Sequence, residues 1–307
     1  MIAVLLVTML AFDDHGYGPV DPVPLPDISV TRQDGAVVRL RDLTAGKRTA
    51  VQFIFTNCPT ACPLLGSLFS KVLKTMEPGP SELLSISVDP ERDTPGRLAE
   101  WLGQFGGGGV SRWVAVRPGP AALAELRRVF GQKEGPPTGH ALQVFYVDAE
   151  SRYVARTTDL PRAAGIIGAL AGRFEMAGKN AALASEAVPS PPSAATGEAI
   201  YQRAQGVVAR VNGETVMAGA ARCANCHGDH GEGRREGALA ASPLHRSALG
   251  ESHSRRGGPP SRYSRETFCH SLRRGIDPAG VVLDAAMPRY DLSDQSCGSL
   301  WDFVIGR

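Results

Sequence analysis

The stretch AVQFIFTNCPTACP, residues 50–63, joins a short apolar run to two cysteines and two prolines. Its first part, 50–55, has the length and the β-branched and aromatic residues of a buried strand. Leucine and valine residues then recur at helical spacing from 64 to 73. The stretch therefore predicts a strand that leads through a cysteine-bearing loop into a helix.

Strand and helix signals alternate along the chain after this stretch. Such alternation is typical of a layered α/β fold with a largely parallel central sheet. Further strands are expected at 83–88, 110–116 and 143–147, and helices at 95–105, 121–130 and 162–174.

A segment rich in alanine, proline and serine, 181–196, divides the chain into two parts. It has too little apolar bulk to pack, and its prolines favour an extended spacer. The chain of 307 residues is long enough for two cores. We expect an α/β domain at 20–180 and a second domain at 197–307.

The apolar N-terminal run, 1–12, is too short to span a bilayer as a straight helix and lacks a positively charged leader. A truncated signal, a weak anchor and a misassigned start all remain open. We favour an export signal within 1–19, because the haem motif described next requires export.

The second domain shows helical periodicity, with helices expected at 197–203, 265–274 and 293–305. Ser293 is placed as an N-cap and Gly275 ends the preceding helix. Because strand signals are few, we expect an all-α domain.

The pentapeptide CANCH, residues 223–227, has the C-x-x-C-H pattern of covalent c-type haem attachment. Cys223 and Cys226 share one face of a helical turn, where each can form a thioether, and His227 can reach the iron from the same side. A zinc site is the alternative, but it needs a second ligand pair. Haem is therefore favoured.

Met287, which precedes a proline in a loop, is the candidate for the second axial iron ligand, ahead of Met217 and the other histidines. The domain resembles class I cytochromes c in the motifs GEAIY at 197–201, CANCHG at 223–228 and MPRY at 287–290. The resemblance implies a small helical domain with His227 and Met287 on the iron, one-electron transfer, and location in a bacterial periplasm or its equivalent.

Cys58 and Cys62 sit where a helix is expected to begin, and the positive end of a helix dipole stabilises a thiolate. A plain structural disulfide is the alternative in an exported protein. His140 lies just before an expected strand, and position alone favours a structural role for it.

The local motifs around these residues closely resemble the Sco/SenC family over about 25–175. The resemblance implies a thioredoxin-like fold and a copper site of Cys58, Cys62 and His140. Two thiolates suit Cu(I), and an added imidazole suits Cu(II). The matching elements are LPD at 25–27, DG at 34–35, CPTACP at 58–63, VDPERDTP at 88–95, and His140 eight residues before Asp148.

Four other side chains receive structural interpretations. Asp89 and Asp93 are expected to shape a loop and cap the helix that follows, rather than act as acid and base. Cys269 and Cys297 lie in two expected helices, and a disulfide between them is slightly favoured over two buried thiols. Such a bond contributes about 3–4 kcal/mol in the loop-entropy account.

The net charge of +2 gives no reason to expect a nucleic-acid partner or an anionic membrane surface. The leading hypothesis is an exported copper chaperone for the dinuclear copper centre of cytochrome c oxidase, coupled to a haem c domain. Its partners would be the copper-receiving subunit, or another periplasmic copper protein, and redox proteins. Membrane association is expected only through the N-terminus.

Two other functions remain open: a thiol-disulfide reductase that uses Cys58 and Cys62 with the haem as electron partner, and a redox sensor or electron carrier. Electron counting favours copper, since haem and copper each exchange one electron and a dithiol exchanges two.

Overall fold

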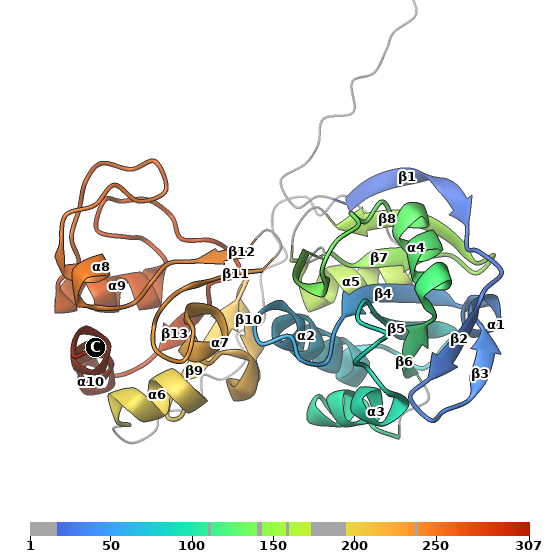
Figure 1. Ribbon diagram of the computed structural model, residues 1–307, viewed down its shortest axis with the longest axis horizontal. Coiled ribbons are helices and arrows are strands. Elements are labelled where there is room, and N and C mark those ends of the chain that lie inside the picture. The colour runs from blue at the N-terminus through green and yellow to red at the C-terminus, as the bar shows by residue number, and fades with distance from the viewer. Residues whose placement is uncertain (1–16, 110–111, 140–142, 158–159, 173–194, 237–238) are drawn as a thin grey trace, which may run out of the picture.

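The computed structural model describes residues 17–109, 112–139, 143–157, 160–172, 195–236 and 239–307. Figure 1 shows two lobes side by side, one ending at α5 (Ala163–Leu170) and the other starting at α6 (Gly197–Arg203). We call them the N-terminal region and the C-terminal region. The expected export segment up to residue 16, and most of the expected linker, lie outside the described residues.

Among the described residues, the N-terminal region forms an eight-stranded sheet with the order β1-β8-β7-β4-β5-β6-β2-β3. Only β4, β5 and β6 pair in parallel, and the other neighbours are antiparallel. The expectation of a largely parallel sheet is therefore wrong outside the centre, because short turns connect β7 to β8 and β2 to β3. The strands are β1 (Tyr17–Pro24), β2 (Ser29–Arg32), β3 (Val37–Arg39), β4 (Arg48–Ile54), β5 (Ser81–Ser87), β6 (Trp113–Pro118), β7 (Phe145–Val147) and β8 (Arg152–Thr157).

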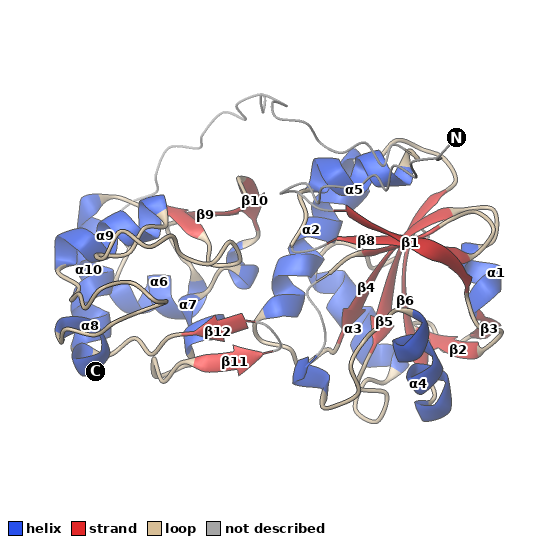
Figure 2. Ribbon diagram, turned by 90° about the horizontal axis from the view of Figure 1, so that it is seen from above, coloured by secondary structure: helices blue, strands red, loops and turns tan. Residues whose placement is uncertain are grey.

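Helices cover both faces of this sheet. Figure 2 shows α2, α3 and α5 on the face turned toward the C-terminal region, and α4 on the opposite face. Aromatic rings fill the space on each side: Trp101 packs edge-on to Trp113 beneath α3, and Phe53 packs edge-on to Phe130 beneath α4. The helices are α1 (Leu40–Thr44), α2 (Ala61–Thr75), α3 (Pro95–Gln104) and α4 (Pro120–Val129), with a 3-10 turn η1 (Pro137–Gly139).

The C-terminal region contains the three expected helices but also short antiparallel strands, so it differs from the all-α domain that was expected. These strands have three or four residues each, too few for an alternating pattern to stand out in the sequence. The elements after α6 are β9 (Val208–Val211), β10 (Glu214–Val216), η2 (Ala218–Ala220), α7 (Cys223–His227), β11 (Arg234–Glu236), β12 (Leu239–Ala241), α8 (Arg246–Gly250), α9 (Arg265–Arg274), β13 (Arg289–Asp291) and α10 (Asp294–Ile305).

The helices α6 and α10 cross at very close range. A Cβ atom placed on Gly197 would lie 2.1 Å from the carbonyl oxygen of Ser299 and 2.6 Å from the Cβ of Phe303. Only glycine allows the two backbones to approach this closely. Beside the crossing, the rings of Tyr201 and Phe303 pack with their centroids 5.6 Å apart.

The disulfide between Cys269 and Cys297 is present and joins α9 to α10, with a Cα–Cα distance of 5.9 Å. This confirms the pairing favoured from the sequence. Ser293 caps α10 by accepting a hydrogen bond from the backbone N–H of Ser296, as predicted.

The two regions are docked through α2. Lys71 on this helix forms an ion pair with the buried carboxylate of Glu214, and Ser67 accepts a hydrogen bond of 2.8 Å from the backbone N–H of Met217. Val211 and Ala220 of the C-terminal region belong to the same buried hydrophobic cluster as the N-terminal core. The interface is therefore apolar at its centre and polar at points along α2.

Candidate functional site

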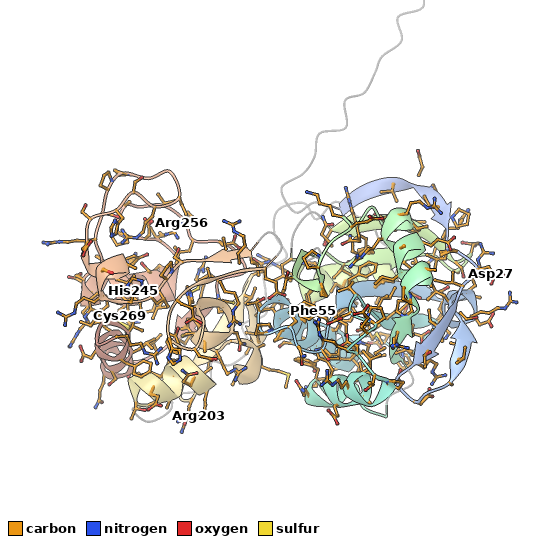
Figure 3. The ribbon with its side chains drawn as sticks, viewed as in Figure 1. Asp27, Phe55, Arg203, His245, Arg256 and Cys269 are labelled. Carbon is orange, nitrogen blue, oxygen red and sulfur yellow. A yellow bond between two sulfur atoms is a disulfide. The ribbon has the colours of Figure 1, made fainter. Side chains whose placement is uncertain are left out.

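Cys58 and Cys62 lie at the N-terminal end of α2, on the side of the N-terminal region that faces the C-terminal region. Phe55, labelled in Figure 3, marks this edge, and its carbonyl oxygen accepts a hydrogen bond of 3.0 Å from the backbone N–H of Cys58. The backbone N–H of Cys62 donates to the sulfur of Cys58 at 3.1 Å. Both cysteines are buried and neither forms a disulfide, so the structure does not contain the structural disulfide that was the alternative.

The prediction that the helix dipole stabilises a thiolate is wrong for Cys62. Burial raises the pKa of Cys62 well above its ordinary value of 9.0. Its hydrogen bond with Cys58 and the charges of Cys58 and Glu236 raise this pKa further, and only the backbone of Phe55 opposes them. Cys62 is therefore a neutral thiol near pH 7, because loss of solvation outweighs the helix dipole. The helix N-terminus instead directs an N–H group at the sulfur of Cys58.

A third side chain, Glu236, reaches these sulfurs from the C-terminal region. The thiol of Cys58 donates to its Oε1 atom at 2.8 Å, and one ligand atom from each of Cys58, Cys62 and Glu236 lies within 4.8 Å of the others. Burial raises the pKa of the Glu236 carboxyl, although the hydrogen bond from Cys58 and the charge of Arg234 lower it in part. Sequence reasoning did not single out Glu236.

His140, the third copper ligand implied by the Sco/SenC resemblance, lies outside the described residues. The Cys58–Cys62–His140 ligand set therefore stays a prediction.

Asp93 has the structural role expected of it, although not as a helix cap. Its carboxylate accepts hydrogen bonds from the backbone N–H of Thr56 at 3.1 Å, from the hydroxyl of Thr56 at 2.6 Å and from the hydroxyl of Ser87 at 2.6 Å. The cap of α3 is Thr94. Asp93 thus ties the loop after β5 to the residues that precede Cys58.

All four residues predicted to hold haem line one cavity of about 810 Å³ in the C-terminal region. Cys223, Cys226 and His227 enter it from α7, and Met287 enters from the loop before β13. Its volume falls within the range typical of cofactor sites. Much of the remaining lining is apolar, with Leu249, Phe268, Leu272, Leu300 and Val304 among it.

His227 is held as an iron ligand would be. Its Nδ1–H donates to the carbonyl oxygen of Ser242 at 2.7 Å, which fixes the tautomer and leaves Nε2 available. Burial lowers the pKa of the imidazole, so the ring is neutral at pH 7, the form that binds metals. Met217 does not line the cavity and is 41% exposed, whereas His245 and His253 do line it and remain rivals to Met287.

The cysteines of the two predicted sites are neighbours. Burial is the main reason why the pKa of Cys226 rises to about 12, and the charges of Cys223, Glu236 and Cys58 add to this effect. Burial likewise raises the pKa of Cys223 to about 12. Cys226, which is predicted to attach haem, therefore senses the charge of Glu236, the carboxylate to which the Cys58 thiol donates its hydrogen bond.

Comparison with known proteins identifies the class of the N-terminal region. Residues 26–173 match the family model described as SCO1/SenC, and this segment of the chain belongs to that family, with its thioredoxin-like fold. The SCO2-like protein of Rickettsia conorii is 30% identical over 140 residues, which cover 42% of this chain and 66% of the relative.

Two solved structures complete the comparison. ScoI of Bradyrhizobium japonicum, solved with copper bound, is 26% identical, with a TM-score of 0.39, and the match covers 52% of this chain and 99% of that one. BsSco, described as a member of the Sco family of cytochrome c oxidase assembly proteins, is 22% identical, with a TM-score of 0.43 and coverage of 51% and 95%. Within the described residues, no helix has the length and apolarity needed to cross a bilayer.

Proposed function

We propose that this chain is an extracytoplasmic copper-binding assembly factor that carries a covalent c-type haem, and that its cargo is destined for the dinuclear copper centre of cytochrome c oxidase. The observation that supports it most directly is the convergence of Cys58 and Cys62, within the SCO1/SenC segment, on one buried point where a third ligand atom is also present. Two sulfur ligands at one point favour a soft ion such as Cu(I).

The proposed copper ligands differ in the oxidation state of copper that they favour. Cys58 and Cys62 hold copper in both oxidation states, and His140 adds an imidazole that favours Cu(II). The carboxylate of Asp93 anchors Thr56 next to the cysteine loop, so the sulfurs are held in place before copper arrives.

The C-terminal region fits a haem group. Cys223 and Cys226 would attach it and His227 and Met287 would bind its iron, and the cavity that these residues share supports this assignment. A haem attached here supplies one-electron exchange. Thioether attachment requires export, which is the basis for the proposed periplasmic or equivalent location.

A thiol-disulfide reductase is the second candidate, and the closeness of Cys58 and Cys62 as two reduced thiols favours it. The two functions differ in their need for copper and for His140, since dithiol chemistry uses neither. Copper binding therefore separates them.

The test is to measure copper and haem per chain in protein exported from a host with haem-attachment machinery. We expect one of each. Replacing Cys58 and Cys62 with serine should remove copper and keep haem, and replacing Cys223 and Cys226 with alanine should do the reverse. Copper that stays bound after the first double replacement would refute the copper site, and covalent haem that survives the second would refute the haem site.

His140→Ala provides a finer test of the ligand set. It should weaken Cu(II) binding more than Cu(I) binding, because imidazole is the harder ligand. If the variant and the parent protein bind Cu(I) with equal affinity and also bind Cu(II) with equal affinity, His140 is not a copper ligand.

A further inference from the structure

The β11–β12 hairpin of the C-terminal region places the carboxylate of Glu236 beside Cys58 and Cys62 of the N-terminal region. Glu236 is the last residue of β11 and pairs with Leu239 of β12, so it stands where the hairpin turns. Leu239 packs against the buried hydrophobic cluster that joins the N-terminal core to Val211, Ala220 and Ala286 of the C-terminal region. The hairpin end therefore lies at the cluster that the two regions share, and the hydrogen bond from Cys58 to Glu236 links it to the N-terminal region.

The arrangement of the three ligand atoms fits a metal ion. The atoms from Cys58, Cys62 and Glu236 lie within 4.8 Å of one another, and all three residues are buried. A carboxylate in such a place costs free energy unless it is hydrogen-bonded or binds a cation. Cys58 supplies one hydrogen bond, and a copper ion that displaced this proton would supply a positive charge to both groups.

We propose that Glu236 supplies a third copper ligand to Cys58 and Cys62, so that the three-ligand site is complete only while the two regions are docked. This inference rests on the copper-binding function proposed above. Binding exchanges the thiol protons for the metal ion, and no electrons move in this step. The carboxylate oxygen is a harder ligand than sulfur, so Glu236 favours Cu(II) over Cu(I).

In the docked arrangement of the two regions, the three proposed copper ligands are also shielded from solvent. Cys58 is 6% exposed, Cys62 is 0% exposed and Glu236 is 4% exposed while the regions are in contact. A receiving protein therefore reaches copper at these sulfurs only after this packing opens, and separation of the two regions would withdraw Glu236. Loss of a ligand and exposure of the sulfurs are thus one event, which favours transfer of copper to the receiving protein.

The experiment uses the full chain and Glu236→Gln, which keeps the shape of the side chain but removes its charge. The matched control is Glu232→Gln, because Glu232 is an exposed carboxylate on the same segment and accepts a hydrogen bond from the backbone N–H of His230. Cys58→Ser together with Cys62→Ser is the negative control. Affinity for each copper ion is measured by equilibrium dialysis against a chelator, and the ligand set by copper K-edge X-ray absorption, which haem iron does not obscure.

We expect Glu236→Gln to lower the affinity for Cu(II) by about tenfold or more, and the affinity for Cu(I) by less. The spectrum should lose an oxygen ligand, and Glu232→Gln should match the parent protein. If Glu236→Gln binds both ions like the parent while the double cysteine variant binds neither, the inference is wrong and the proposed function stands.

Two further outcomes would also overturn the inference. A loss of affinity with an unchanged ligand set would mean that Glu236 supports packing rather than ligation. If the double cysteine variant binds copper like the parent protein, the proposed function itself fails, and the inference fails with it.

Discussion

The crossing of α6 and α10 predicts a large effect for the smallest possible substitution, Gly197→Ala. The new Cβ would lie 2.1 Å from the backbone oxygen of Ser299, where about 3.4 Å is an ordinary contact, so the helices must separate by roughly 1 Å. Overpacking of this kind costs about 1–3 kcal/mol, and we take the upper end because a backbone oxygen cannot rotate away. The helix propensity of alanine returns at most about 1 kcal/mol.

The net loss should therefore be about 2 kcal/mol in the free energy of unfolding. For a region of this size, that corresponds to a fall of about 8 °C in the midpoint of its thermal transition. Scanning calorimetry of the haem-loaded chain measures it, with haem absorbance used to identify the transition of the C-terminal region.

Gly103→Ala is the matched control for this substitution. Gly103 lies in α3 at an exposed position, and nothing lies within 4 Å of a Cβ placed there. This variant should be neutral or slightly more stable than the parent protein. If Gly197→Ala is as stable as Gly103→Ala, the close approach of the two helices is not what holds the C-terminal region together.

Two other predictions concern the same region. Met287→Ala should remove the sulfur-to-iron charge-transfer absorption of the ferric haem; if the absorption persists, a residue other than Met287 holds that iron position. Replacing Cys269 and Cys297 with alanine should cost about 3.6 kcal/mol by the loop-entropy relation for a separation of 28 residues, measured by denaturant unfolding. A loss below about 1 kcal/mol would show that the unfolded chain is already restricted at these positions.

The sequence contained enough information to predict the centre of the N-terminal fold. The apolar run at 50–55 and the leucines that follow it correspond to β4 and α2, because buried strands and amphipathic helices carry strong periodic signals. The strands β1, β2, β3 and β8 were not predicted. Prolines interrupt β1, which lies at the edge of the sheet, and the pairing of such strands depends on partners distant in the sequence.

The two sites differed in how much the sequence revealed. The haem-attachment motif was visible in the sequence because Cys223, Cys226 and His227 lie close together in the chain, and the haem assignment stays a prediction. Glu236 could not be found in this way, because it is 178 residues away from Cys58 and no spacing rule connects them. Only the docking of two regions that are far apart in the sequence brings that carboxylate to the sulfurs.

The nearness of Cys58 to Cys226 has a consequence for how the molecule matures. Before the proposed haem is attached, the chain carries both as thiols, and the charge of Cys58 contributes to the raised pKa of Cys226. In an oxidising compartment, thiols that come into contact can pair, and a cross-link between these two would consume a proposed haem anchor and a proposed copper ligand together. Thioether formation removes Cys226 from this competition. Biogenesis should therefore follow an obligatory order, with haem attached before the regions close and copper loaded last.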